Sequence, residues 1–430
     1  MSVGVALASM LNVLITARYL GPAGRGQLAL VMSIATVTST LAGLSLDQAT
    51  VNMGSVHPGA RAALATNALL FSALLGLGAA GLLALLTLIA PAITGHLPAA
   101  LMWLTVASIP FLVARPYLGA LVEADYRFTV SNASRLIAPL SAIVVNLLLA
   151  AMGALTVISA SVTWVAGQLL GLVLIMLFLW LRSTGFGRAD VDLARRTFRF
   201  GVKAHVGRAL NAANYRLDQW LLGVLATRRE LGLYSVAVAC SEVLFLLPTT
   251  LAKVQRPDLA RATRAVAARK AAAVFRAAVV LMIPAAAALV IAAPVLSAAL
   301  FGPSFNGAID DLRILAAGAF GVTAVKLLGD ALTAQRRPLL SSVAVGFGCV
   351  FTVALDLVLI PRLAGLGAAI ASTIAYSAGG LMAAGLFLRT LGGGPRDLWP
   401  RPADVANVAR VARRIARGSR RSRGDRQRAA

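Results

Sequence analysis

Apolar residues in this chain are gathered into about a dozen blocks, each long enough to cross a lipid bilayer. A membrane-spanning helix needs roughly 20 apolar residues, and blocks of about this length recur along the whole sequence. Backbone polar groups inside a bilayer must be hydrogen-bonded within their own segment, so such blocks fold as helices. The predicted spans are 2–17, 27–46, 63–90, 97–122, 136–153, 156–181, 201–226, 232–254, 272–296, 309–334, 339–360 and 365–388.

The composition supports a membrane protein and excludes several other classes. Hydrophobic residues make up 59% of the chain and charged residues 13%, against roughly 45–50% and about 25% in soluble domains. Cys240 and Cys349 both lie inside apolar blocks and the three histidines are far apart, so we expect no disulfide, metal site or cofactor. No P-loop, GxSxG or HExxH spacing occurs, which argues against an enzyme or an ATP-driven pump.

The basic residues predict how the chain is oriented. The tail from Arg389 onward contains twelve arginines and residues 182–199 contain five, whereas the six loops on the opposite side contain five Lys and Arg together. The positive-inside rule then places both termini in the cytoplasm, with an even number of spans in the cell membrane. This asymmetry accounts for most of the net charge of +24, so a nucleic-acid partner is not needed to explain it.

The chain divides into two similar halves. We expect an N-terminal lobe at 1–182, a basic cytoplasmic linker at 183–200, a C-terminal lobe at 201–390 and a basic cytoplasmic tail at 391–430. A faint repeat joins the halves, because LGPAGRGQLAL (20–30) and LATRRELGLYSV (225–236) each place a glycine, Gly26 or Gly232, at the start of a helix. Halves that begin on the same membrane side are parallel repeats with the binding site between them. The predicted fold is all-α, with two six-helix lobes around a central cavity.

The seventh predicted span is the most polar. Projected at 100° per residue, one arc of this helix holds Arg208, Asn211, Arg216 and Asp218, with Asn214, Tyr215 and Gln219, while the other arc is mainly apolar. Such a helix needs water or polar protein on one side. We predict that the polar arc lines an aqueous cavity; the alternative is that its residues only pair with neighbouring helices. Arg216 and Asp218 are two residues apart on separated faces, so each needs another partner.

Other charges lie within predicted spans, where each normally faces a cavity or a partner. Arg115 lies between two prolines, which break a helix and expose carbonyl groups. Glu242 has no local partner and is a candidate proton or cation site. Lys326 and Asp330 are four residues apart, so they either neutralise each other or take part in ion coupling. Asp356 is expected to be a solvated helix end near the outer surface.

Basic groups in a cavity suit an anionic substrate. Arginines bind phosphate through paired, charge-assisted hydrogen bonds, and the diphosphate of a polyprenyl carrier fits this chemistry. An anionic drug or a nucleotide would fit it equally well.

The tail has a different composition from the spans. Arginines surround a stripe formed by Val405, Val408, Ala412 and Ile415. A helix with this pattern lies on anionic cytoplasmic lipid, each basic residue contributing roughly 1 kcal/mol. The alternative is a solvated tail that only sets the membrane orientation.

Several segments resemble bacterial polysaccharide flippases of the multidrug, oligosaccharidyl-lipid and polysaccharide exporter superfamily. They follow the family order over nearly the whole chain: ARYLGPAGRGQLAL (17–30), RFTVSNASRLIAPLSAIVVNLLL (127–149), DQWLLGVLATRRELGLY (218–234), LFGPSF (300–305) and DLVLIPRLAGLGAAIASTIAY (356–376). The resemblance implies alternating access that flips polyprenyl-diphosphate-linked oligosaccharide, coupled to an ion gradient or to the membrane potential. Cationic residues of the cavity hold the diphosphate in this family, and Arg18, Arg115, Arg208 and Arg216 are the matching candidates here. Polysaccharide polymerases and glycosyltransferases would be partners.

Two other functions stay open at this stage. A cation-coupled drug exporter of the same superfamily would have an acidic cavity if its drugs are cationic. A non-transporting membrane partner of a polysaccharide synthase would depend on its tail and not on its cavity.

Overall fold

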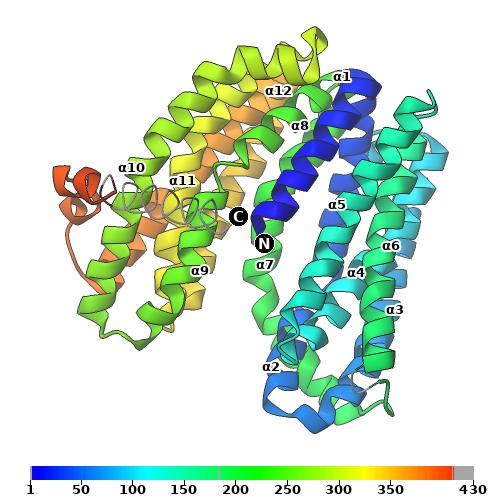
Figure 1. Cartoon of the computed structure of the whole chain (residues 1–430), viewed down its shortest axis with the longest axis horizontal. Coiled ribbons are helices and arrows are strands. Elements are labelled where there is room, and N and C mark those ends of the chain that lie inside the picture. The colour runs from blue at the N-terminus through cyan, green and yellow to red at the C-terminus, as the bar shows by residue number, and fades with distance from the viewer. Residues whose placement is uncertain (1, 183–184, 409, 411–430) are drawn as a thin grey trace, which may run out of the picture. The chain divides into compact units, whose positions relative to one another are not determined.

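The computed structural model describes residues 2–182, 185–408 and 410, and every regular element in these residues is helical. The all-α, multi-pass membrane fold expected from the sequence is confirmed (Figure 1). The α-helices are α1 (Ser2–Ala42), α2 (Leu46–Val56), α3 (Arg61–Ile89), α4 (Ala99–Ala124), α5 (Phe128–Ala151), α6 (Val157–Arg182), α7 (Val191–Leu225), α8 (Arg228–Ser241), α9 (Leu246–Arg261), α10 (Arg264–Leu296), α11 (Ala308–Ala334) and α12 (Pro338–Leu391). Short helical turns are η1 (Pro58–Ala60), η2 (Pro91–Thr94), η3 (Ser297–Phe301), η4 (Pro303–Phe305) and η5 (Pro395–Leu398).

The predicted spans can be followed in these helices. Eight helices are long and apolar enough to cross a membrane, or nine if α8 and α9 form one bent span. Two of the eight, α1 and α12, each contain two helices joined at a kink. When α1 and α12 are each divided at the kink, α8 and α9 are taken as one bent span and the polar α7 is included, each of the twelve predicted segments coincides with a helical segment of the described chain.

Local chemistry explains the two kinks. Gly21 takes φ 66°, a left-handed value that suits glycine, and Pro22 follows it without a backbone N–H for the helical ladder. In α12 the kink lies at Ala364, where φ is 49°, three residues after Pro361. No stretch of loop therefore separates the first two predicted spans, and residues expected in an outer loop belong to α1.

Three boundaries differ from the sequence prediction. α7 begins at Val191, α10 at Arg264 and α5 at Phe128, each about eight to ten residues before the apolar block. These helices extend beyond the hydrocarbon because charged residues such as arginine have a favourable helix propensity in water. The eighth predicted span is broken between Ser241 and Leu246 and bends by 43°.

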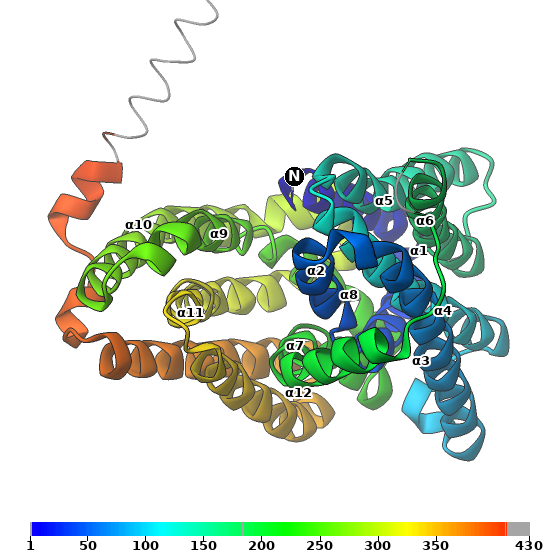
Figure 2. The ribbon, with the colours of Figure 1, turned by 90° about the horizontal axis from the view of Figure 1, so that it is seen from below.

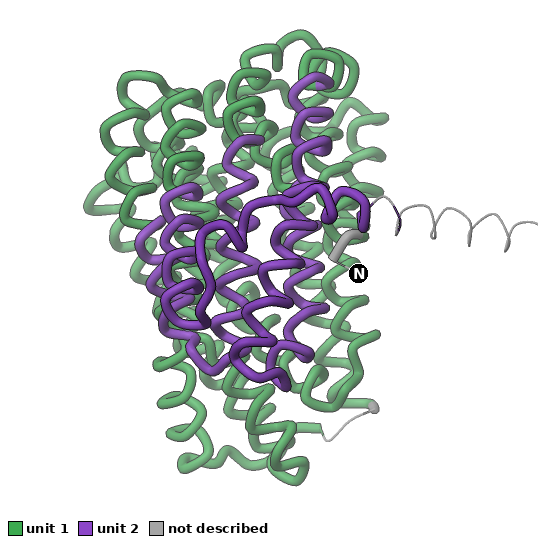
Figure 3. Tube along the Cα trace, turned by 90° about the vertical axis from the view of Figure 1, so that its left-hand side faces the viewer, with its two compact units in different colours: residues 1–243, 293–315, 349–375 green, residues 244–292, 316–348, 376–430 purple. Residues whose placement is uncertain are grey.

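Contacts divide the chain into two compact units, each built from separate stretches (Figure 3). Unit 1 contains 1–243, 293–315 and 349–375, and unit 2 contains 244–292, 316–348 and 376–430. The lobe boundaries at 182 and 201 stay a prediction. In unit 1, α3 packs on α4 and α5 packs on α6, and these four helices lie side by side in Figure 1.

A close helix crossing in unit 1 joins the two repeats noticed in the sequence. α1 packs against α8, and a Cβ at Gly26 would overlap the carbonyl oxygen of Arg228. A Cβ at Gly232 would overlap the carbonyl oxygen of Pro22 in the same way. The contact is reciprocal, with a spacing of four residues on each helix, so the two segments are related by a local twofold. Only glycine allows backbones to approach this closely.

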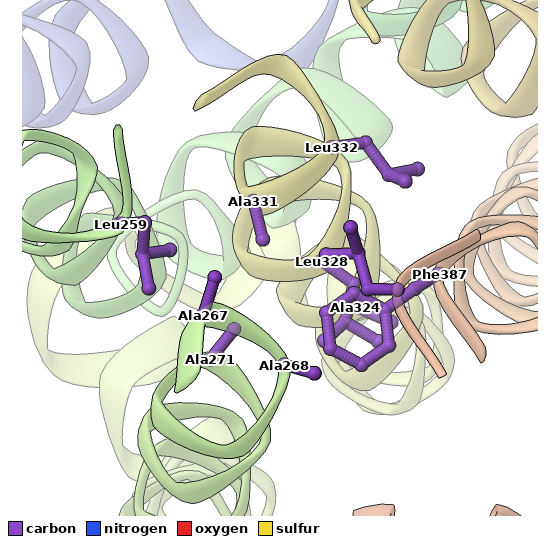
Figure 4. Close-up of a cluster of buried hydrophobic side chains, with 10 residues drawn as sticks. Leu259, Ala267, Ala268, Ala271, Ala324, Leu328, Ala331, Leu332 and Phe387 are labelled. Carbon is purple, nitrogen blue, oxygen red and sulfur yellow. The ribbon is translucent and has the colours of Figure 1, made fainter. Parts of the chain in front are cut away.

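Unit 2 is centred on a cluster of small and large apolar side chains (Figure 4). Alanines of α10 let α9, α11 and α12 approach it, and Phe387 fills the remaining space. Viewed from below, α9 and α10 lie together and α11 lies beside them (Figure 2). The cluster consists of Leu259, Ala267, Ala268, Ala271, Ala324, Leu328, Ala331, Leu332, Phe387 and Leu391.

We expect Gly26→Ala and Gly232→Ala each to lower the free energy of unfolding by about 1–3 kcal/mol, because the added methyl has no room. Thermal unfolding of the purified protein in detergent measures this. Gly78→Ala and Gly81→Ala are matched controls, since nothing lies within 4 Å of a Cβ at either position; both should be neutral or stabilising. Equal melting temperatures for all four variants would contradict the close crossing.

Candidate functional site

α7 carries most of the candidate residues. The side chain of Asp190 caps its start by accepting a hydrogen bond from the Leu193 N–H at 2.9 Å. Further along, Asn214, Asp218 and Gln219 are buried, although they belong to the polar arc. Polar groups buried inside a membrane bundle need partners or ligands, and the neighbours of α7 supply some of them.

Asp218 is held by a hydrogen-bond network. The Tyr234 hydroxyl of α8 donates to its Oδ2 at 2.6 Å, and Ser372 of α12 donates to the same oxygen at 3.4 Å. The backbone N–H of Gln219 donates to Oδ1 at 2.7 Å. Two hydroxyls and an amide are acceptable partners for a carboxylate, but none of them is a counter-ion. Asp218 is therefore satisfied in hydrogen bonds, and it forms no ion pair in the described part of the chain.

Asp356 lies beside this network, and the expectation of a solvated outer end is wrong. Its exposed fraction is 0%, and neither carboxyl oxygen has a hydrogen-bond partner in the described chain. The carboxyl group of Asp218 lies within electrostatic reach of it. One helical turn earlier in α12, Thr352 donates to the Oδ1 of Asn214 at 2.8 Å. Because α12 continues without loop to Ala364, Asp356 lies in the interior and not at an exposed end.

Arg216 and Asp218 do not pair with each other, as their spacing predicted. Arg216 instead forms an ion pair with Glu242 at 3.2 Å, so Glu242 has a partner that its local sequence did not reveal. Arg25 of α1 lies close enough for its like charge to act on Arg216. Arg25 is only 6% exposed, and its Nε is buried without a hydrogen-bond partner in the described residues. Two guanidinium groups thus lie within electrostatic reach of each other, and one of them, Arg216, is paired with Glu242.

Arg208 is engaged at the start of α2. It forms an ion pair with Asp47 in the first turn of that helix. Near it, Ser45 and the Nδ1 of His205 are 3.3 Å apart, and the Tyr117 hydroxyl donates to the Gly43 carbonyl at 2.5 Å. These contacts bridge the break between α1 and α2, where Ser45 has a positive φ of 51°.

The other predicted anion-binding residues lie elsewhere in unit 1. Arg18 is exposed and donates to the carbonyls of Ala299 and Leu300 at 3.1 and 3.4 Å. Arg115 is half-buried next to α6, where its Cδ would lie 3.5 Å from a Cβ at Gly171. Asn211 is half-buried on α7.

The remaining ion-coupling candidates, Lys326 and Asp330, belong to α11 in unit 2. The Nε of Arg256 in α9 donates to the Oδ1 of Asp330 at 2.7 Å, so Asp330 has a partner other than the i,i+4 lysine that the sequence suggested. Lys326 is half-buried.

The structure therefore brings together Arg216, Asp218 and Glu242, and it adds Arg25 and Asp356. Arg25 belongs to the segment 17–30, as Arg18 does. It could have been found from the sequence as a charged residue within one turn of the apolar span that begins at residue 27. Tyr234 and Ser372 had no such signal, because a hydroxyl in a membrane helix often bonds its own backbone.

This arrangement has two chemical capacities. Arg25 and Arg216 offer more positive charge than Glu242 neutralises, which suits an anion. Asp218 and Asp356 are two buried carboxyl groups with oxygen-bearing neighbours and no basic partner of their own, which suits a proton or a hard monovalent cation. The predicted central cavity between lobes stays a prediction.

The helical order and this buried polar centre define the class as a multi-pass membrane protein with the fold of a transporter. The sequence profile of the family described as polysaccharide biosynthesis protein matches residues 15–310. The chain belongs to this family, which confirms the resemblance noted in the sequence. None of the curated protein sequences matches.

Solved structures show the same fold at low sequence identity. An inward-facing multidrug resistance transporter of the MATE family and MOP superfamily aligns with a TM-score of 0.74 and 13% identity, covering 90% of this chain and 94% of its own. The lipid II flippase MurJ, in an inward closed conformation, aligns with a TM-score of 0.71 and 14% identity, covering 92% and 88%. An outward-facing multidrug resistance MATE transporter aligns with a TM-score of 0.56 and 13% identity, covering 90% of this chain and 94% of its own.

We expect opposite effects from two conservative substitutions at the buried carboxyls. Asp218→Asn should lower the free energy of unfolding by on the order of 1–3 kcal/mol, because an amide nitrogen or oxygen cannot accept all three hydrogen bonds. Asp356→Asn should not destabilise, because it removes a buried acid with no partner. Thermal unfolding in a buffer without alkali cations measures both. Equal losses would contradict the absence of partners at Asp356.

Proposed function

We propose that this protein is a flippase that moves polyprenyl-diphosphate-linked oligosaccharide repeat units across the cell membrane for surface polysaccharide synthesis. Its family and its fold support a transporter. The observation that carries the substrate assignment is Arg25, a buried arginine with an unsatisfied Nε beside Arg216. Such a centre is costly in a bilayer unless an anion visits it.

The diphosphate is the anion that this chemistry fits best. Each guanidinium presents a planar fork of donors that matches two phosphate oxygens, and two forks match two adjacent phosphates. Glu242 holds Arg216 at 3.2 Å while the site is without substrate. When the diphosphate binds Arg216, Glu242 would lose this ion pair. Its unpaired charge would then favour a change of conformation.

The coupling ion is assigned to Asp218 and Asp356. Two neighbouring buried carboxyls cannot both be ionised at low cost without a proton or a cation between them. A proton or sodium ion entering from outside would neutralise this pair, and its passage inward would supply the energy for outward transport. Asn214, Tyr234 and Ser372 are the neutral oxygen and nitrogen groups around the pair.

The proposed orientation has both termini in the cytoplasm, with the twelve helices forming lobes at 1–182 and 201–390 that alternate around the substrate. Arg18, Arg115 and Arg208 would then serve entry or exit, since each already has a position outside the Arg25 and Arg216 pair. Polysaccharide polymerases and glycosyltransferases are the proposed partners, because they use or supply the lipid-linked unit.

We expect Arg25→Gln and Arg216→Gln each to reduce transport of a labelled polyprenyl-diphosphate sugar into proteoliposomes at least tenfold. Each substitution keeps a polar side chain and removes the charge that pairs with phosphate. Arg313→Gln is the matched control, because Arg313 forms an exposed pair with Asp310 at 3.4 Å and should keep full activity.

The same assay separates the rival functions. Efflux of cationic dyes without transport of the lipid-linked sugar would favour a drug exporter. No transport of either compound by the wild-type protein, together with loss of polymer in cells after deletion of 401–430, would favour a synthase partner. Full transport by the Arg25→Gln, Arg216→Gln double variant would refute the proposed substrate site.

The coupling assignment has its own test. Sodium, or a fall in pH, should raise the melting temperature of the wild-type protein, because the bound ion neutralises the carboxyl pair. Asp356→Asn should remove this response while leaving transport of substrate down its own gradient. Asp330→Asn is the control, because Asp330 is engaged by Arg256 in the other unit. A response that survives in Asp356→Asn would place the ion elsewhere.

A further inference from the structure

Residues 392–408, named here the C-terminal strap, are fastened to α10 by one arginine. Arg276 of α10 donates from Nε to the Oδ2 of Asp404 at 2.8 Å and from Nη1 to the Asp397 carbonyl at 2.6 Å. Both side chains of the ion pair are nearly buried, at 12% and 10% exposed. Leu398 packs against the apolar cluster of unit 2. The strap therefore has a fixed place on unit 2.

The strap is held at the depth of the lipid headgroups. α10 ends at Leu296, and Arg276 lies 20 residues before it. At about 1.5 Å per residue this distance is about 30 Å, the thickness of the hydrocarbon core. With the hydrocarbon ending at Leu296, where the predicted span ends, Arg276 lies four residues inside the other end of that span, close to the point where α10 leaves the hydrocarbon. The strap it fastens lies along that interface.

The outward side of the strap combines aromatic and basic groups. Trp399 is 76% exposed and Val405 53%. Gly392 and Gly393, with φ of 94° and 111°, turn the chain sharply out of α12 into the strap. Indole rings prefer the interface between water and hydrocarbon. An exposed tryptophan at this depth is therefore in its preferred environment only if lipid covers it.

The charges near Trp399 do not cancel. Asp404 is neutralised by Arg276, and Asp397 pairs with Arg401 at 3.0 Å. Arg389 and Arg396 are exposed, and no carboxylate of the strap is left to pair with them. The end of α12 and the strap therefore have a net positive charge in the same stretch of chain as the exposed Trp399. This charge is complementary to phosphate groups at the membrane surface.

We propose that the strap is a binding surface for anionic phospholipid of the cytoplasmic leaflet, with Arg389 and Arg396 on the headgroup phosphate and Trp399 between the acyl chains. The side of the membrane follows from the orientation proposed above; the binding itself does not depend on the transported substrate. The stripe predicted from Val405 to Ile415 is described only as far as Val408, and its other residues lie outside the described chain.

The fastening is stable at physiological pH. Burial opposes ionisation of Asp404, but hydrogen bonds from Arg276 and from the backbone N–H of Arg401 outweigh it and lower the pKa of Asp404 below its usual value. A lowered pKa contributes stability that is present at neutral pH and lost only as the pH falls through the folded value. The ion pair that fastens the strap is therefore present at neutral pH.

Quenching of Trp399 fluorescence by brominated lipid tests the proposal on the full chain in nanodiscs of 70% phosphatidylcholine and 30% phosphatidylglycerol. Bromine is placed on one lipid or on the other. The chain contains five tryptophans, so the difference between wild type and Trp399→Phe isolates this residue. We expect brominated phosphatidylglycerol, per mole, to quench Trp399 about twofold more than brominated phosphatidylcholine.

Two double variants separate the strap from general basic charge. Arg389→Gln with Arg396→Gln should make the two lipids equal quenchers. Arg195→Gln with Arg196→Gln, which removes two exposed arginines from α7, should leave the preference unchanged. Equal quenching in the wild type, or the same loss in both double variants, would overturn the proposal.

Two further outcomes would also overturn it. Quenching by neither lipid would mean that the strap faces water or a protein. Displacement of brominated phosphatidylglycerol by an equimolar polyprenyl diphosphate would assign the surface to the transported lipid. A flippase assay that fails while the lipid preference persists would refute the proposed function alone.

Discussion

A charged side chain inside a bilayer needs a partner, and this requirement organises the structure. Arg208 pairs with Asp47 and Arg256 with Asp330 across helices that are far apart in the sequence, and Arg216 of α7 pairs with Glu242 at the end of the next helix, α8. Each pair neutralises a charge that is at least partly buried, and Asp330, whose side chain is 5% exposed, depends most on its partner. These pairs fix which helix faces which neighbour. The ion pairs therefore contribute to helix packing, whether or not they also take part in transport.

Two residues of unit 1 break this rule with opposite signs. Among the residues that the structure describes, Arg25 has a buried nitrogen without a hydrogen-bond partner, and Asp356 has two such oxygens. The two positions are connected through α7, because Arg25 acts on Arg216 and Asp356 acts on Asp218. Arg216 and Asp218 are separated by one residue and point to different sides of the helix. An anion on one side and a cation on the other would therefore act on the same rigid element. This is a direct physical route by which an ion gradient and a substrate can be linked.

The sequence predicted the helices better than their contacts, for a physical reason. Hydropathy is a local property, so the apolar blocks located all twelve segments to within a few residues at most ends. Pairing depends on tertiary structure, and the partners of Glu242 and Asp330 come from other helices. Arg25 fell between the predicted spans 2–17 and 27–46, and so was expected in an outer loop. The chain instead kinks at Gly21 and continues as a helix, which carries Arg25 inward. Asp356 was placed wrongly for the same reason. A loop was assumed after residue 360, whereas α12 continues past it.

The repeat noticed in the sequence explains both the scaffold and its polarity. Gly26 and Gly232 occupy equivalent places in a reciprocal contact, so the two halves meet at a local twofold. A second contact follows the same symmetry. Asn146 of α5 donates to Asn12 of α1 at 2.8 Å, and Thr352 of α12 donates to Asn214 of α7 at 2.8 Å. In each half the first helix is therefore tied to the fifth by a neutral hydrogen bond. Only the second half adds Asp218 and Asp356 around this bond. A symmetric scaffold can exchange two conformations at little cost, and in the proposed mechanism an acidic pair on one side alone would make that exchange depend on a cation.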